Sequence, residues 1–164
     1  MIEKIISGGQ TGADQGALMA AQILKIETGG YIVKNYMTET GPNHDLKKYN
    51  LQELNSPSYV TRSIKNIQES DGTLVFYFKE SVGTAKTIGY CISGKWTNIY
   101  EQTSTPYKPL LIINKFDFDY NIVKEFIKKY KIKTLNVAGN RQSHFSYDFE
   151  ENVKNYIINL FKQE

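Results

Sequence analysis

The sequence has few of the features that mark secreted, membrane-bound or disulfide-stabilised proteins. Its one cysteine, Cys91, excludes an internal disulfide and any cysteine-rich metal site, and it fits a reducing compartment. No apolar run approaches the roughly 18 residues that would span a bilayer, and the N-terminal residues do not form a signal-peptide pattern. We therefore expect a cytoplasmic protein without a membrane partner.

An excess of charge of one sign is also missing. Twenty Lys and Arg residues stand against 17 Asp and Glu residues, which gives a formal net charge of +3. No block of five or six like charges occurs, so we expect no nucleic-acid partner. His44 and His144 are not spaced with other ligand types as a metal site requires, so we expect no directly bound metal. Cys91 falls beside core positions of an expected helix, where a buried, inert thiol is the simpler interpretation.

The composition that remains is typical of a chain that folds around one core. Of the 164 residues, 40% are hydrophobic and 13% are aromatic. No repeat, low-complexity tract or linker divides the chain. We therefore expect a single domain over residues 1–164.

Short β-branched runs alternate along the chain with longer stretches of helical period. We expect strands over residues 4–7, 31–33, 73–78, 110–113 and 134–137. We expect helices over residues 13–25, 58–69, 119–131 and 146–162, and one after Ser81 whose inner face carries Ala85, Ile88 and Ile92. This alternation predicts an α/β fold, a Rossmann-like three-layer sandwich with a mainly parallel sheet of about five strands. Residues 34–55 lack periodicity and are expected to form a long functional loop.

Polar loops, each containing glycine, follow three of the expected strands, at residues 7–14, 81–84 and 138–143. Parallel strands end at the same edge of a sheet, so these loops should meet where ligands bind in such folds. Glycine lets the backbone approach a ligand, and a helix N-terminus favours an anion. A tight structural turn explains any one loop equally well, but polar side chains in all three favour binding. The first loop is neither a dinucleotide-binding nor a Walker motif.

The candidate site consists of groups that could hold a phosphate and of a polar rim around it. We expect the backbone N–H groups of residues 8–12 and the guanidinium of Arg141 to bind the phosphate. Arg62 and Asn66, spaced i, i+4 on one helix, could form a side wall, with a solvated helix face as the alternative. Glu39 or Asp71 would accept from a heterocycle or a sugar. The expected ligand-binding residues are Gly8, Gly9, Gln10, Thr11, Gly12, Asp14, Arg62, Asp71, Gly83, Thr84, Asn136, Gly139, Arg141 and Ser143.

Taken in order, these motifs resemble those of the "putative molybdenum carrier" proteins, in the circularly permuted YpsA-related branch of the SLOG superfamily. The resemblance rests on residues 7–14, Thr-Glu-x-Gly-Pro at 38–42, Tyr-x-x-Arg-x-x-x-Asn-x-x-x-Ser-Asp-Gly-Thr at 59–73, Gly-Thr at 83–84 and Leu-Asn-Val-Ala-Gly-x-Arg-x-Ser at 135–143. It implies a Rossmann-like fold that binds a nucleotide-like or pterin-phosphate ligand, with molybdenum cofactor as the name-giving candidate.

The sequence departs from that family at several positions. Asn140 and Gln142 stand where the family usually has Pro and Glu, and residues 144–147 lack its Pro-Gly. Ser81-Val82-Gly83-Thr84 replaces a Ser-Gly-Gly-Thr. Residues Trp96 to Tyr107 form an insert, which we interpret as a lid, a homo-oligomer contact or an idle loop.

Two functions follow as expectations. The first is a non-catalytic small-molecule binding protein for a phosphorylated ligand, either a carrier of molybdenum cofactor or a binder of a nucleotide derivative. Any metal would arrive inside that ligand. The second is a nucleotide-processing enzyme that cleaves an N-glycosidic bond, as members of the wider superfamily do. It would need a carboxylate near the anomeric carbon, and Glu39 is the candidate.

Overall fold

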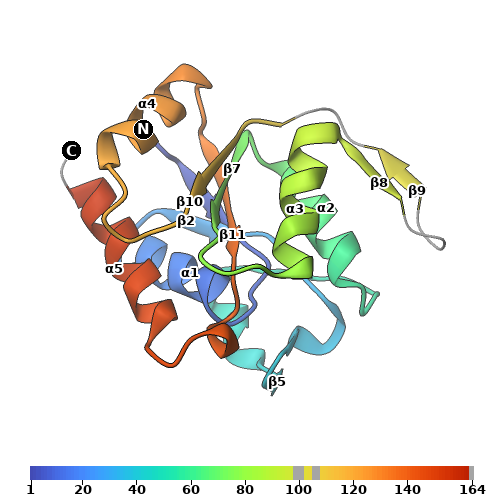
Figure 1. Cartoon of the computed structure of the whole chain (residues 1–164). Helices are drawn as coiled ribbons and strands as arrows, with labels where there is room; N and C mark the ends of the chain where they lie inside the picture. Colours follow the sequence, from blue (N-terminus) through green and yellow to red (C-terminus); the bar gives the residue numbers. More distant parts are fainter. Residues whose placement is uncertain (98–101, 105–107, 163–164) are drawn as a thin grey trace.

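A five-stranded parallel sheet forms the centre of the computed structural model, which describes residues 1–97, 102–104 and 108–162 (Figure 1). Its strands are β1 (Lys4–Ile6), β2 (Glu27–Gly29), β7 (Gly72–Phe76), β10 (Leu110–Ile113) and β11 (Thr134–Gly139), in the order β10-β7-β11-β1-β2. All four pairings between them are parallel. The expected α/β sandwich is confirmed, and β11, last in sequence, lies in the middle of the sheet.

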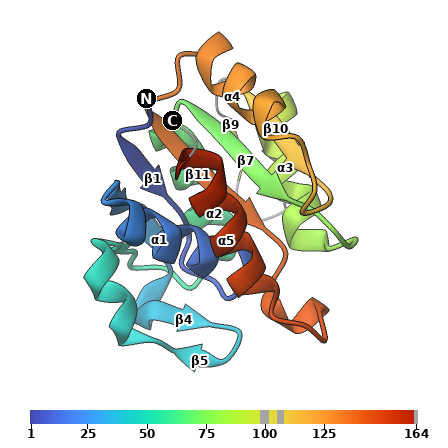
Figure 2. The same ribbon diagram turned by 90° about the vertical axis from the view of Figure 1, so that its left-hand side faces the viewer.

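Helices cover both faces of this sheet. Helices α1 (Ala13–Leu24), α4 (Tyr120–Lys129) and α5 (Phe149–Lys162) pack on one face around the larger apolar core (Figure 2). Helices α2 (Tyr59–Glu69) and α3 (Val82–Ser93) lie together on the other face. Their shared core of buried side chains is small and consists of Ile64, Ile67, Tyr90 and Cys91. Most expected strands and helices are confirmed, with ends shifted by at most three residues.

The prediction that residues 31–33 form the second strand of the central sheet is wrong. Helix α1 ends at Leu24, where Lys25 adopts a left-handed conformation with φ 59°, and the chain returns at once as β2. The expected strand at 31–33 is instead β3 (Tyr31–Ile32), which pairs with β6 (Gln52–Glu53) in a separate ribbon. Gly30, with φ +117°, lies between the two strands, and a side chain there would approach within 2.3 Å of the Ser7 carbonyl oxygen.

The region expected as a long loop is built from short elements. They are η1 (Lys34–Tyr36), β4 (Met37–Thr38), β5 (Gly41–Pro42), η2 (His44–Tyr49) and β6. Strands β4 and β5 pair antiparallel. The region packs around its own cluster of buried side chains: Leu18, Ile32, Tyr36, Leu46, Tyr49 and Leu51. These contacts fix the segment that carries Glu39 against the N-terminal half of α1.

The inner face of α3 also differs from the expectation. Thr84, Thr87, Tyr90 and Cys91 are its buried residues, whereas Ala85 is exposed and Ile92 is 58% exposed. The spacing of apolar residues in the sequence therefore predicted the wrong inner face for α3. Much of the true inner face borders the polar cavity and not an apolar core, so it carries threonines.

The insert lies after α3 and is only partly described. Strands β8 (Lys95–Thr97) and β9 (Gln102–Ser104) pair antiparallel within it and extend beyond the C-terminal end of α3 (Figure 1). The remaining residues of the expected insert, 98–101 and 105–107, lie outside the described residues. Within the described part of the chain, no helix has the length and apolar character needed to cross a membrane.

Candidate functional site

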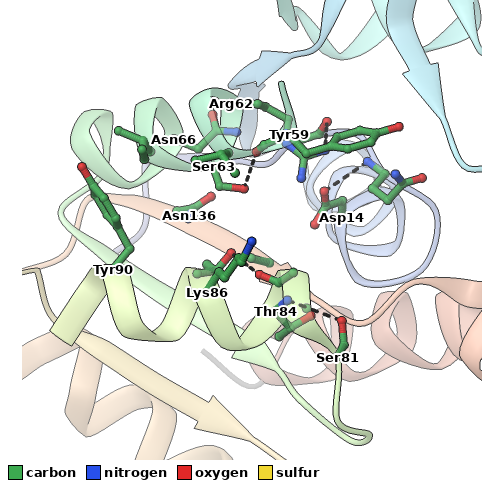
Figure 3. A pocket seen from close by; sticks show the side chains of 18 of the residues that line it. Asp14, Tyr59, Arg62, Ser63, Asn66, Ser81, Thr84, Lys86, Tyr90 and Asn136 are labelled. Atoms are coloured by element: carbon green, nitrogen blue, oxygen red, sulfur yellow. Dashed lines mark hydrogen bonds between the residues drawn. The ribbon is translucent and has the colours of Figure 1, made fainter. Parts of the chain in front are cut away.

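A cavity opens between α2 and α3 above the carboxyl ends of the central strands (Figure 3). It encloses about 820 Å³ of empty space, including its open mouth. All three polar strand-end loops contribute to it, together with one face of α2. Its lining is Gly8, Gln10, Asp14, Tyr59, Val60, Arg62, Ser63, Ile64, Asn66, Ser81, Gly83, Thr84, Lys86, Thr87, Tyr90, Asn136, Val137, Ala138, Gly139 and Arg141.

Both arginines of the chain line this cavity, whereas the other 18 basic residues are lysines. Arg62 comes from α2 and Arg141 from the loop after β11, and each guanidinium lies 5.1 Å from the centre of the Tyr59 ring. Gly8 leaves room for the Arg62 side chain, because a Cβ added at Gly8 would lie 2.6 Å from Arg62 Nε. Arginine offers a planar set of donors that matches an oxyanion, so this placement favours an anionic ligand.

Asp14 is the buried carboxylate of the cavity. It lies in the first turn of α1, is 5% exposed, and accepts a hydrogen bond from Gln10 N at 3.1 Å. Burial raises the pKa of Asp14, while the charge of Arg62 and the hydrogen bond from Gln10 N act in the opposite direction. Neither arginine takes part in an ion pair within 4.0 Å among the described residues. Two guanidinium groups and one carboxylate leave the cavity with excess positive charge.

The cavity also holds donors that lack an acceptor. Among the described residues, two buried side-chain polar atoms have no hydrogen-bond partner, Gln10 Nε2 and Arg62 Nε. Both belong to lining residues, and both are donors. The other end of the Gln10 amide is fixed, because Oε1 accepts from Thr11 N at 3.0 Å and from Glu39 N at 2.8 Å. Buried polar groups are nearly always paired, so the missing group is an acceptor.

The backbone of the first glycine-rich loop is less available than expected. Gln10 N donates to Asp14, Thr11 N donates to Gln10, and Gly12 N donates to Glu150 Oε2 at 2.7 Å. Three of the five expected phosphate donors therefore already have protein acceptors, which contradicts a backbone cradle at residues 10–12. Gly9 and Gly12 do not line the cavity. At Gly12, with φ +84°, an added Cβ would lie 2.4 Å from the Asn140 carbonyl oxygen.

Glu39 lies outside the cavity, in a second hollow that Thr11 and Ser143 also line. It accepts hydrogen bonds from Thr11 Oγ1, from Ser143 N at 3.2 Å and from Ser143 Oγ at 2.5 Å. Burial would raise the pKa of Glu39, but these hydrogen bonds and the charge of Arg141 outweigh it and lower the pKa. Glu39 therefore clamps the β4–β5 hairpin to the short helix η3 (Gln142–His144), and the structure does not bring it to the expected site.

Asp71 is the clearest misplacement. It is exposed, and its Oδ2 accepts from Lys133 N at 2.9 Å and Thr134 N at 2.8 Å, at the start of β11. Asp71 precedes β7, so it lies at the amino ends of the strands, whereas the cavity lies at their carboxyl ends. The structure therefore places Asp71 away from the cavity, and its position before the strand was the sequence signal for this placement.

The two departures at the last motif have structural roles. Asn140 is fully buried, and its amide bonds Phe78 N at 2.7 Å, Lys79 N at 3.0 Å and Lys79 O at 2.9 Å. Gln142 Oε1 accepts from Glu150 N at 2.9 Å near the start of α5. These bonds fasten the loop that carries Arg141 on both sides, and so orient that arginine toward the cavity.

The helix faces around the cavity were only partly foreseen. Tyr59 and Ser63 of α2 line the cavity, as do Thr87 and Tyr90 of α3, and the sequence motifs did not mark Ser63, Thr87 or Tyr90. The spacing of Thr84, Thr87 and Tyr90, three residues apart, was the signal available in the sequence. Asn66 lines the cavity as expected, but its amide is bonded to the backbone of Tyr31 at 2.8 and 3.1 Å.

The expected residues thus fall into two groups. Those that line the cavity are Gly8, Gln10, Asp14, Arg62, Gly83, Thr84, Asn136, Gly139 and Arg141. Those placed elsewhere are Gly9, Thr11, Gly12, Asp71 and Ser143. Among the described residues, no three His, Cys, Asp or Glu side chains gather as a metal site would require.

Comparisons with known proteins agree with this architecture. A family model described as the circularly permutated YpsA SLOG family matches residues 5–161, which include every element that lines the cavity. The chain is similar to the crystal structure of a "Putative molybdenum carrier protein" from Syntrophus aciditrophicus SB, with 30% identity and a TM-score of 0.79. That similarity covers 98% of this chain and 94% of the other. No curated protein matches. The chain belongs to the circularly permutated YpsA SLOG family.

Proposed function

We propose that the protein binds a phosphorylated small molecule in the cavity between α2 and α3, with the phosphate at Arg62, Arg141 and Gln10. The observation that carries this proposal is the pair of buried donors without acceptors, Gln10 Nε2 and Arg62 Nε, in one positively charged cavity. A phosphate supplies several acceptor oxygens and negative charge at once.

The ligand class follows from the remaining walls. Tyr59, Ile64 and Tyr90 give the cavity aromatic and apolar surface, which suits a planar heterocycle attached to the phosphate. Nucleotide derivatives and pterin phosphates such as molybdenum cofactor share this chemistry, and the similar solved protein is named a putative molybdenum carrier. With molybdenum cofactor, the same arginines would hold the phosphate, and the dithiolene of the ligand would supply the molybdenum ligation.

Binding without turnover is the better-supported form of this proposal. The enzymatic alternative relied on Glu39, which lies in the second hollow and is committed to Thr11 and Ser143. Asp14 is the carboxylate that lines the cavity, but it is held by Gln10 N and is nearly inaccessible.

Calorimetry with AMP, ADP-ribose and molybdenum cofactor, at about 0.1 mM protein, tests this function in the wild type and in two variants, Arg62→Gln and Arg141→Gln. Each variant should weaken binding at least tenfold, because a hydrogen bond to a charged group contributes about 1.5–3 kcal/mol and 1.4 kcal/mol is tenfold. Thermal unfolding would verify that each variant is folded.

Lys79→Gln is the matched control, because it removes one positive charge beside the same edge of the sheet. Lys79 Nζ donates to His144 O at 2.6 Å and lies over Phe145, and Lys79 does not line the cavity. Its affinity should stay within twofold of the wild type. The proposal fails if none of the three ligands binds, or if a folded Arg141→Gln variant binds as tightly as the wild type.

A further inference from the structure

The floor of the cavity carries the side-chain amide of Asn136, which has an acceptor oxygen in addition to donor hydrogens, unlike the arginines. Asn136 lies in β11, is 3% exposed and lines the cavity. Its Nδ2 donates to Thr73 Oγ1 at 3.2 Å, and Thr73 is its register partner on β7. Figure 3 shows the Asn136 side chain between α2 and α3, below Ser63.

Thr73 fixes which end of this amide faces the cavity. Thr73 is fully buried, and its Oγ1 accepts the hydrogen bond from Asn136 Nδ2. A hydroxyl has one proton but two lone pairs. One lone pair of Thr73 Oγ1 accepts from Asn136 Nδ2, so the oxygen end of the amide is directed away from Thr73. The Asn136 NH2 group therefore points down to Thr73, and its Oδ1 points into the cavity.

The hydroxyl groups of Ser63 and Thr87, which line the same cavity, do not donate to the oxygen of Asn136. The nearby hydroxyl groups are committed elsewhere, since Ser63 Oγ donates to Tyr59 O at 2.9 Å and Thr87 Oγ1 donates to Gly83 O at 3.2 Å. The arginine end of the cavity thus lacks an acceptor, and the Asn136 oxygen at the floor is an acceptor that a ligand donor could meet. A single ligand that carries both kinds of group would satisfy both.

Resting on the proposed function, we propose that Asn136 Oδ1 selects ligands whose heterocycle presents an N–H donor, such as an exocyclic amino group, and rejects analogues with a carbonyl at that position. Ile64 of α2 and Tyr90 of α3 add apolar and aromatic atoms to the lining of the same cavity. A carbonyl placed against Asn136 would leave two acceptors facing each other without a proton, which a dehydrated site penalises strongly. Thr73 acts as a positioning residue, because it holds the amide and does not line the cavity.

AMP and IMP test this selection, because they share ribose and phosphate and differ by a 6-amino against a 6-oxo group. In calorimetry the wild-type protein should bind AMP at least tenfold more tightly than IMP. Asn136→Leu should reduce that ratio to below about threefold, while binding remains sensitive to Arg141→Gln.

Thr73→Val is the more discriminating variant. Without the Thr73 hydroxyl, the Asn136 amide could rotate and present its NH2 group to the 6-oxo group of IMP. We expect IMP to gain affinity and the AMP to IMP ratio to fall at least fivefold. A purely structural role for Thr73 would change both affinities together. Thr134→Val, a Thr→Val change at the amino end of β11, should leave the ratio unchanged and serves as the control.

The outcomes separate this inference from the function on which it rests. Equal binding of AMP and IMP by the wild type overturns the role of Asn136 and leaves the phosphate site standing. An unchanged ratio in folded Asn136→Leu and Thr73→Val variants also overturns it. Binding of neither nucleotide overturns it as well, whatever the arginine variants show with the other ligands.

Discussion

The two strand-to-helix junctions beside the cavity use glycine for opposite purposes. Between β1 and α1, successive backbone N–H groups bond to the side chains of Asp14, Gln10 and Glu150, and a side chain at Gly12 would collide with the backbone around Asn140. Between β7 and α3, Ser81 caps the helix through Thr84 N at 3.4 Å, and an added Cβ at Gly83 would meet no atom within 4 Å.

The first junction is therefore filled by the protein itself, and the second is open toward the cavity. A glycine-rich loop before a helix does not by itself make an anion site, because its amides can be satisfied internally. The positive charge of the cavity comes instead from Arg62 on α2 and Arg141 after β11.

The strongest test of the comparison is Gly12→Ala. A residue with a side chain is strained at φ +84°, and its Cβ would lie 2.4 Å from the Asn140 carbonyl oxygen. Strain and overpacking together should lower the free energy of unfolding by about 3 kcal/mol, which corresponds to a Tm lower by about 6–12 °C. Calorimetric unfolding would measure it, and a decrease below 2 °C would show that the first junction is not tightly filled.

An intermediate effect is expected from Glu39→Gln, which weakens the clamp beside the filled junction. At pH 7 the variant should lose about 1–2 kcal/mol of stability, because hydrogen bonds to the carboxylate from Thr11 and Ser143 are weakened. The fold lowers the pKa of Glu39, so the wild-type advantage is complete above its ordinary value of 4.5. That advantage disappears as the pH falls through the lower, folded value.

Denaturant unfolding at pH 7 and at successively lower pH would measure this difference. Glu69→Gln, at an exposed carboxylate near the end of α2, is the control and should change stability by less than 0.5 kcal/mol, as is usual for surface positions. A Glu39→Gln difference that grows as the pH falls would contradict the clamp.

The smallest expected effect, and the one of opposite sign, is Gly83→Ala. The position is exposed, lies in the first turn of α3, and has free space for a methyl group. Alanine favours a helix over glycine by about 0.5–1 kcal/mol, so Tm should rise by about 1–4 °C. Measured beside Gly12→Ala under one set of conditions, a decrease in Tm for Gly83→Ala would remove the contrast between the junctions.

Features that depend on local sequence were predicted well. The buried run at 73–78 and the amphipathic stretch at 119–131 correspond to β7 and α4, because burial and period are recorded in consecutive residues. Arg141 and Gly139 were placed in the site for a related reason, since residues that follow a parallel strand gather at its carboxyl end.

Features that depend on distant partners were not predictable in the same way. Whether the amide of Gly12 is free depends on Glu150, which is 138 positions away in the sequence. The inner face of α3 was misassigned because Thr84 and Thr87 border a cavity, and a cavity leaves no apolar pattern. Gln10 and Arg62 could be recognised as candidates, but their lack of acceptors is a property of the assembled site.

The position of β11 has a consequence for how the protein is made. β11 separates β1 from β7, so the strand pairs β1–β2 and β7–β10 cannot form one sheet until residues Thr134–Gly139 are inserted between them. Asn136 lies in this strand, and Arg141 follows two residues after its end. During synthesis, the nascent chain therefore completes its sheet and its binding cavity together, only after the last strand has left the ribosome.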